Sequence, residues 1–239
     1  MKVLRRLLLA VTGLALVPFL AAGPAPKVVS IDDLEGSAKL DALIERVVER
    51  QRALRTLEAE FVLLKESSLL LEAVESTGDF LFRAPDLVRW DYQQPDSMVV
   101  LFAEDTVTTY HPAQARAEQI KVSNKQRRFV RVLAGTQPLD DLISHFSITL
   151  ADPGGRAPYQ LTLRPLGNIL SKKLQTVEIE VDRELLLPVV IEYNEADGDS
   201  TRYEFKKMVI NPEIDDSRFD LELGADVKME TLDASSGVG

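Results

Sequence analysis

The sequence predicts a mainly β protein of the α+β class, in which an amphipathic helix precedes a large antiparallel sheet that is interrupted by about two more helices. Short apolar runs, separated by turn-forming residues, recur roughly every eight to twelve residues, as in an antiparallel meander. Residues 37–55 and 125–147 instead show helical spacing. The 239 residues are 45% hydrophobic, which suffices for one sizeable core, and neither a repeat nor a linker indicates a second domain.

The N-terminus has the features of an export signal. A short basic region precedes an apolar core at residues 7–20, which has the length typical of a signal peptide and is short for a membrane span. Small residues follow, so we expect cleavage near Ala22 and interpret residues 1–22 as a signal peptide; an uncleaved anchor helix is the alternative. Residues 23–36 are then predicted to form a leader loop, and residues 37–230 a single domain.

Charge and cysteine content restrict the classes of partner. The chain has 28 basic and 38 acidic residues, for a net charge of −10. Removal of the predicted signal peptide, which contains three basic residues and no acidic ones, would change the net charge to −13. Such a surface repels phosphate backbones and anionic lipids, so we expect neither nucleic-acid binding nor stable membrane insertion. The chain has no cysteine, so core packing alone must stabilise it. We expect a soluble, monomeric protein of the periplasm.

The first helix is expected from about Ser37 to Arg55. Its apolar residues fall close to helical spacing, while Asp, Glu and Arg fill the other face, so the helix is predicted to pack on a sheet. The stripe consists of Leu40, Leu43, Ile44, Val47, Val48 and Leu54.

From about Leu57 the apolar period changes to that of strands. The stretch "FLFRAPDLVRWDYQQPDS", residues 80–97, reads as a hairpin that contains the only tryptophan, Trp90. Alternation places five large side chains on one face of this hairpin. They are Phe80, Phe82, Val88, Trp90 and Tyr92.

The second half continues this alternation after a helical break. Within residues 125–147, Gly135 and Pro138 separate two helical stripes. Further strands are predicted in "YQLTLRP", "LQTVEIEVD", "LPVVIEYN", "STRYEFKKMVI" and "SRFDLEL", the middle three joined as hairpins. Residues 231–239 are expected to be a disordered tail.

Motifs for catalysis are lacking. Cysteine chemistry is excluded, the two histidines lie far apart in sequence, and no serine sits in a Gly-x-Ser-x-Gly elbow. Neither a zinc-ligand spacing nor a glycine-rich phosphate loop occurs. We therefore predict that the protein is not an enzyme and has no metal or cofactor.

Several strands carry more apolar residues than a sheet with one wet face needs. Residues 62–64, 69–71, 99–102, 185–187 and 189–191 are apolar at successive positions. Such strands need cover on both faces, or they line a cavity on one of them. A compact sandwich without a cavity is the alternative.

Three segments resemble the periplasmic outer-membrane lipoprotein carrier (LolA-type) family. They are "GDFLFRAPDLVRWDYQQPDS", "TTYHP" at residues 108–112 and "NPEIDDSRFDLELGADVKM" at residues 211–229, and the resemblance covers roughly residues 38–229. It implies an incomplete antiparallel β-barrel of about 10–11 strands, whose concave face is covered by a lid of about three helices from residues 37–55 and 125–147.

The resemblance also implies transport instead of catalysis. A protein of this family takes the acyl chains of lipoproteins from an inner-membrane ATP-driven exporter and carries them to an outer-membrane acceptor. Alternatives are a relative that carries another lipid for a different exporter, or a compact periplasmic adaptor. We expect Arg83 and Arg89 to make lid or release contacts. The predicted lipid cavity is lined by Phe61, Leu63, Phe80, Phe82, Val88, Trp90, Tyr92, Val100, Phe129, Leu133, Leu142 and Ile143.

Overall fold

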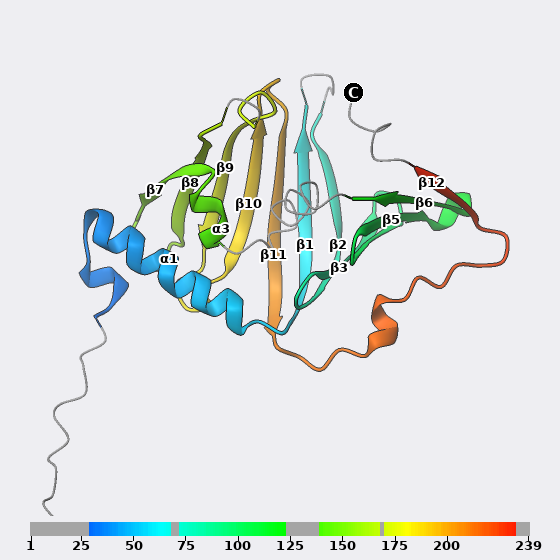
Figure 1. The fold of residues 1–239 in the computed structure, drawn as a ribbon, viewed down its shortest axis with the longest axis horizontal. Coiled ribbons are helices and arrows are strands. Elements are labelled where there is room, and N and C mark those ends of the chain that lie inside the picture. Colours follow the sequence, from blue (N-terminus) through cyan, green and yellow to red (C-terminus); the bar gives the residue numbers. More distant parts are fainter. Residues whose placement is uncertain (1–28, 68–71, 123–138, 168–169, 233–239) are drawn as a thin grey trace, which may run out of the picture.

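The computed structural model describes residues 29–67, 72–122, 139–167 and 170–232. These residues form one curved, open sheet of twelve strands with a long helix across one face (Figure 1). The strand order is β12-β6-β5-β4-β3-β2-β1-β11-β10-β9-β8-β7, so β12 and β7 are the two edges. The mainly β class and the unclosed sheet are confirmed.

The first six strands follow one another as a meander, and so do β7 to β11. Their bounds are Thr56–Glu66 (β1), Val74–Arg83 (β2), Leu87–Gln94 (β3), Met98–Ala103 (β4), Thr106–His111 (β5), Arg116–Lys121 (β6), Phe146–Ala151 (β7), Tyr159–Pro165 (β8), Leu174–Val181 (β9), Pro188–Glu195 (β10), Ser200–Ile210 (β11) and Lys228–Leu232 (β12).

The two meanders join at the centre of the sheet, where β1 pairs with β11 in antiparallel register from Leu57–Ile210 to Glu66–Ser200. Asn211, which follows β11, fixes the corner where the helix meets β1. Its Oδ1 accepts hydrogen bonds from the backbone N–H groups of Arg55 (2.7 Å) and Thr56 (3.3 Å). Its left-handed backbone (φ 55°) suits an asparagine, which adopts this conformation more readily than most residues.

The helix α1 spans Gly36–Ala53 and confirms the helix predicted at residues 37–55. Its apolar stripe buries Leu43, Val47 and Val48 in the common core, and its opposite face stays charged. Arg50 and Arg52 lie in its last turn, where positive charges interact favourably with the helix dipole. We call the sheet face toward α1 the inner face.

The inner face carries most of the core. Alternate residues along each strand point to this face. The pairing register places them opposite residues of the neighbouring strand that point to the same face. Its almost fully buried members include Phe61, Phe80, Leu161, Leu163 and Val177. The alternation predicted for β1 to β3 and β8 to β11 is therefore confirmed.

The C-terminal segment covers part of the outer face. After β11 the chain runs along the sheet to the short 3-10 helix η3, Asp216–Phe219, and on to β12 (Figure 1). Phe219 is buried there, as is Leu81 of β2. The prediction of a strand in "SRFDLEL" is wrong, because Asp215 accepts from the N–H of Ser217 and turns the chain into η3.

Other details of the expected fold also change. The described residues contain twelve strands, not 10–11, and β12 pairs with β6 in parallel. The three-helix lid is not confirmed: besides α1 they contain only the short α3, Leu139–Ile143, and three 3-10 helices, while residues 125–138 lie outside the described ranges. Phe146, which lies within the predicted helical stretch 125–147, begins β7.

The predicted terminal segments are described only in part. The predicted leader loop contains the 3-10 helix η1, Ile31–Asp33, whose Ile31 is buried. The predicted tail begins within β12, and residues 233–239 lie outside the described ranges, as do residues 1–22. The single domain at residues 37–230 stays a prediction.

Candidate functional site

An aromatic cluster forms the middle of the inner face. The rings of Phe61 and Trp90 meet edge to face, with centroids 4.8 Å apart and planes at 80°. Phe80 lies 4.5 Å from Trp90, and Phe205 and Tyr203 of β11 lie 5.7 Å and 5.0 Å from it. Edge-to-face and tilted aromatic pairs are favourable beyond the area they bury. The cluster is therefore a packed apolar wall, with Trp90 only 7% exposed.

The strand register explains why these rings meet. Phe80 pairs directly with Trp90, and Gly78 pairs with both Phe61 and Tyr92. A Cβ on Gly78 would lie 1.9 Å from the carbonyl oxygen of Asp91 and 2.8 Å from the Phe61 ring. Only glycine at this position therefore lets β3 approach β2 while the Phe61 ring lies over residue 78. The Phe61 ring centre is then 5.0 Å from that of Tyr92.

The tyrosines of this wall remain uncharged. Burial, together with the neighbouring Tyr203 phenol, raises the pKa of Tyr92. Burial likewise raises the pKa values of Tyr193 and Tyr203. The wall thus presents no negative charge to an apolar ligand.

Two narrow apolar cavities lie where the C-terminal half of α1 meets the inner face. The larger, of about 50 Å³, is lined by Gln51, Leu54, Leu57, Phe80, Phe82, Leu187, Pro188, Ile191, Phe205 and Met208. The smaller, of about 20 Å³, is lined by Val47, Gln51, Leu139, Leu142, Val177, Ile179, Val181, Pro188, Ile191 and Tyr193. An engineered cavity of about 150 Å³ binds benzene, so neither holds a long acyl chain unless α1 moves.

Gln51 is the polar side chain that both cavities share. Its Oε1 accepts a hydrogen bond of 3.0 Å from the N–H of Leu139, the first residue of α3. This bond satisfies a backbone donor at the start of α3 and fixes which end of the carboxamide faces that helix.

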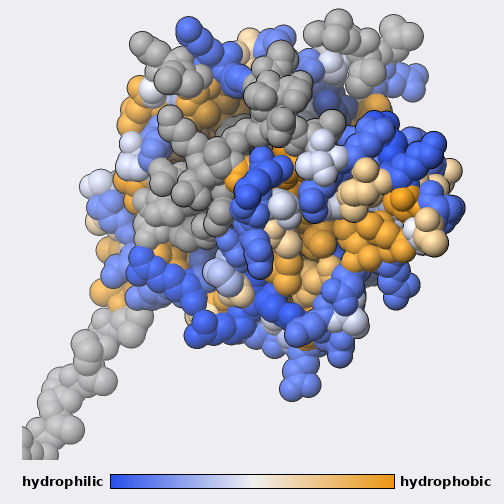
Figure 2. All heavy atoms as spheres, turned by 45° about the vertical axis from the view of Figure 1, so that its right-hand side comes forward, coloured by the Kyte–Doolittle hydropathy of each residue, from blue (hydrophilic) through white to orange (hydrophobic). Residues whose placement is uncertain are grey.

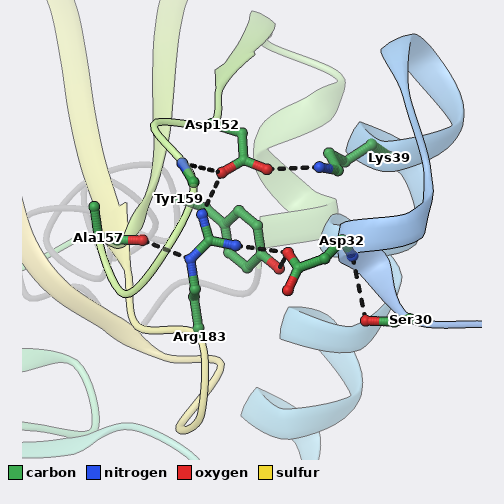
Figure 3. A network of polar contacts seen from close by, with 8 residues as sticks. Ser30, Asp32, Lys39, Asp152, Ala157, Tyr159 and Arg183 are labelled. Carbon is green, nitrogen blue, oxygen red and sulfur yellow. Dashed lines mark hydrogen bonds and ion pairs between the residues drawn. The ribbon is translucent and has the colours of Figure 1, made fainter.

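A polar network holds the other end of α1 (Figure 3). Arg183 binds Asp32 of η1 (2.6 Å) and Asp152, which follows β7, while its guanidinium lies 4.1 Å from the centre of the Tyr159 ring. Lys39 of α1 binds the second oxygen of Asp152 at 2.6 Å. The N-terminal end of α1 is therefore tied to the tips of two hairpins.

The network shifts the acidity of its members. The hydrogen bond from Lys39, assisted by Arg183 and the N–H of Gly154, lowers the pKa of Asp152 to about 2. Burial and the hydrogen bond to Asp32 raise the pKa of Tyr159 to about 12. Asp152 is thus ionised and Tyr159 neutral at physiological pH.

The structure brings most of the predicted cavity residues to one face. Each lies on the inner face at the position that strand alternation predicts. These are Phe61, Leu63, Phe80, Phe82, Val88, Trp90, Tyr92 and Val100. Phe80 and Phe82 line the larger cavity, and Leu142 lines the smaller.

The remaining predicted residues are placed differently. Ile143 is 46% exposed and borders a hollow on the charged side of α1, not the cavities. Phe129 and Leu133 lie outside the described residues.

The two predicted lid arginines point to the outer face. Arg83 binds Asp216 and the carbonyl of Ile214, and its guanidinium lies 4.9 Å from the Phe219 ring. Arg89 binds Asp91 (2.8 Å) and the carbonyl of Asp220 (2.8 Å). In the described part of the chain both anchor the C-terminal segment, and the expected lid or release contact stays a prediction.

Several lining residues were missed from the sequence. Ile191, Tyr203 and Phe205 lie in predicted strands and alternate correctly. The place of Tyr203 and Phe205 beside Trp90 depends on the pairing of β11 with β1, and Ile191 pairs with Tyr203 from β10. Gln51 carries no local signal, because its partner is 88 residues away.

The family model of the outer membrane lipoprotein carrier protein LolA matches residues 52–222, which is most of the chain and includes the aromatic wall. The chain belongs to the LolA family. A comparison with curated proteins found no match.

Solved structures share this LolA fold. MucB matches with a TM-score of 0.52 and 16% identity, over 82% of this chain and 66% of MucB. An uncharacterised conserved protein from Thermus thermophilus matches with a TM-score of 0.52 and 11% identity, over 82% of this chain and 100% of that protein. The chain thus spans slightly less than two thirds of MucB, and at these identities the likeness shows the fold alone.

LolA-family folds suit a carrier of hydrophobic ligands. On the side that carries β12, Figure 2 shows hydrophobic residues gathered in a patch that hydrophilic side chains border. No helix within the described ranges is long and apolar enough to cross a membrane. Those ranges also contain no cluster of three acidic or histidine side chains arranged to hold a metal ion.

Proposed function

We propose that this LolA-family protein is a soluble periplasmic carrier that shields the acyl chains of a lipoprotein between α1 and the inner face of its sheet. The observation that carries the proposal is the continuous apolar wall around Trp90, which adjoins two apolar cavities under α1. Burial of each methylene group is worth about 0.8 kcal/mol, so such a wall can hold an alkyl chain that water would reject.

Binding requires α1 to move, because the cavities are far smaller than an acyl chain. Its two ends differ in how they are held: Asn211 and the chain itself fix the C-terminal end, and ion pairs fix the N-terminal end. Loss of these ion pairs would let α1 swing from the Asn211 corner. Cargo then enters by displacing α1, and release follows when a partner offers a drier site.

The proposed route has an inner-membrane ATP-driven exporter as the donor and an outer-membrane protein as the acceptor, as in the family's established role. The acidic surface, with a net charge of −10, favours basic patches on both partners. The protein acts as a binding protein, not as an enzyme.

The test uses Trp90, the only tryptophan, as a contact probe. Dibromostearic acid quenches tryptophan fluorescence on contact, whereas stearic acid binds without quenching. We expect saturable quenching that stearic acid competes away, and co-purified lipid in native mass spectrometry. Absence of both would contradict the proposal.

A compact periplasmic adaptor is the second candidate. The low exposure of Trp90 and the small cavity volumes favour it. An adaptor would show no saturable quenching, and its Trp90 emission would not change when lipid is added.

A further inference from the structure

A hollow of about 360 Å³ lies on the charged side of α1, separate from the two cavities. Its apolar lining comes from Ile44 and Val48 of α1 and from Ile143 of α3, whose side chain is 46% exposed. Its polar lining comes from four side chains of α1, which are Asp41, Glu45, Glu49 and Arg52. The hollow therefore joins an open apolar surface to three acidic side chains and one basic side chain.

The three acidic side chains form a row along α1. Asp41, Glu45 and Glu49 lie four residues apart, so neighbours in the row are separated by about 6 Å along the helix axis. All three are exposed, and within the described ranges none of their carboxylates forms an ion pair or a hydrogen bond. Exposed acids elsewhere do find partners, as Glu60 does with Lys207 (2.7 Å).

Three basic side chains of α1 bind elsewhere, so they do not neutralise this row. Arg46 donates to the carbonyl of Val29 (2.6 Å). Arg50 donates to the carbonyl of Leu185 (3.1 Å), and Lys39 belongs to the polar network at the N-terminal end of the helix. Like charges four residues apart on a helix repel and destabilise it. The row therefore lowers the stability of the free protein, which indicates that its charges act on something outside the described chain.

A basic helix fits both parts of the hollow. Basic side chains at every fourth position of a helix repeat at the same spacing of about 6 Å, so a helix that lies along α1 brings its cations to the acidic row. An apolar side chain beside these cations covers the exposed Ile143 and removes apolar surface from water. Nucleic acids and anionic lipid surfaces are instead repelled by the row.

We propose that this hollow is the docking surface for a basic amphipathic helix of a protein partner, whose Arg or Lys side chains pair with Asp41, Glu45 and Glu49 and whose apolar side chain packs on Ile143. The inference rests on the proposed function for the role of this partner, which is to exchange cargo with the carrier. On its other face α1 buries Leu43 in the core. A partner docked here thus contacts the element that must move before cargo enters.

The test uses the full chain and a stapled helical peptide that has Arg at every fourth position and a row of Leu beside them. Fluorescence anisotropy of the labelled peptide measures its affinity. Asp41→Asn, Glu45→Gln and Glu49→Gln together should weaken binding about tenfold at physiological salt, as expected for the loss of three exposed ion pairs. The same variant should unfold at the wild-type temperature or above it, because repulsion within α1 is removed.

A matched variant separates this site from the attraction of any basic peptide to a chain of net charge −10. Glu66→Gln, Glu72→Gln and Glu75→Gln together remove three exposed carboxylates around the connection of β1 and β2, remote from α1 (Figure 1). They should change the affinity by less than about twofold. Ile143→Ser should weaken binding about threefold through its lost apolar contact. A peptide with Glu in place of Arg should not bind.

Unchanged affinity after neutralisation of the acidic row would overturn the inference, as would an equal loss in both triple variants, which marks unspecific attraction. Binding that appears only after neutralisation of the basic stretch at residues 125–131 would assign the hollow to that stretch of the same chain, and so overturn it too. The assay contains no lipid, so these results leave the fatty-acid quenching test unaffected. Absent quenching with retained peptide binding would instead overturn the carrier function and the partner's role in it, but not the docking surface.

Discussion

The ammonium group of Lys39 lies 2.6 Å from Oδ2 of Asp152, and this contact ties the first turn of α1 to the end of β7. The other carboxylate oxygen of Asp152 accepts a hydrogen bond from Arg183. One carboxylate therefore lies between two cations that come from different parts of the fold. All three side chains are mostly shielded from solvent. The stability of this junction should therefore depend on the charge of Asp152.

Asp152→Asn should lower the free energy of unfolding by about 1–2 kcal/mol at pH 6, allowing for partial exposure of the site. The folded pKa of about 2 lies below the ordinary 3.8, so the contribution is complete above about pH 4 and disappears as the pH falls through 2. Urea unfolding followed by Trp90 fluorescence at pH 6, 4 and 3 measures this. Asp33→Asn, on an exposed neighbour, is the control, and a constant difference at all three pH values would contradict the assignment.

Gly78→Ala should destabilise the sheet by about 1–3 kcal/mol or more, because its Cβ has no room beside the Asp91 carbonyl and the Phe61 ring. Gly167→Ala is the matched control, since a Cβ there meets no atom within 4 Å. Chemical denaturation of both variants measures these changes in the free energy of unfolding. Equal stability of the two would show that β2 and β3 separate without loss.

Phe61→Ala should cost about 3–5 kcal/mol, because it removes the ring that packs against both Trp90 and Tyr92. Val209→Ala, at a position 50% exposed, should stay within about 0.5 kcal/mol of wild type. The measurement is the unfolding midpoint in urea, with the slope checked for constancy. A loss below about 1 kcal/mol for Phe61→Ala would mean that the aromatic wall repacks freely.

Arg83→Ala should release the C-terminal segment from the outer face, because it removes the contacts to Asp216, the Ile214 carbonyl and the Phe219 ring. Amide hydrogen exchange in residues 214–222 should accelerate about tenfold, as expected for a loss of about 1.4 kcal/mol of local stability. Lys121→Ala removes only an exposed pair with Asp105 and is the control. Unaltered exchange in Arg83→Ala would assign the anchoring to Arg89 and to the ion pair of Arg218 with Glu58 of β1 (2.9 Å) instead.

Local patterns predicted the elements whose partners are close in sequence. In the hairpin at residues 80–92 the side chains point to the faces that alternation predicts, because the register of this hairpin depends on only one turn. Helix α1 likewise follows from its own apolar spacing. The predicted cavity residues on β1 to β4 share a face for the same reason.

The features that were missed depend on distant partners. β12 adds in parallel beside β6, and the ion pair of Arg116 with Glu230 supports this contact (3.1 Å). The "SRFDLEL" segment alternates like a strand but pairs with no strand, and Arg83 and Arg89 hold it on the outer face instead. Neither the pairing of β12 with β6 nor the docking of this segment can be predicted from the spacing of apolar residues within the segments themselves.

The pairing of β1 with β11 has a consequence for how the protein is made. All of β1 to β6 can form early, yet the edge of β1 finds its partner only when residues 200–210 arrive. Until then the apolar side chains of β1 and β2 are exposed beside an unpaired strand, the kind of intermediate that aggregates. Such non-local closure slows folding, so a newly made chain should need protection by a holding factor until synthesis of the whole domain is complete.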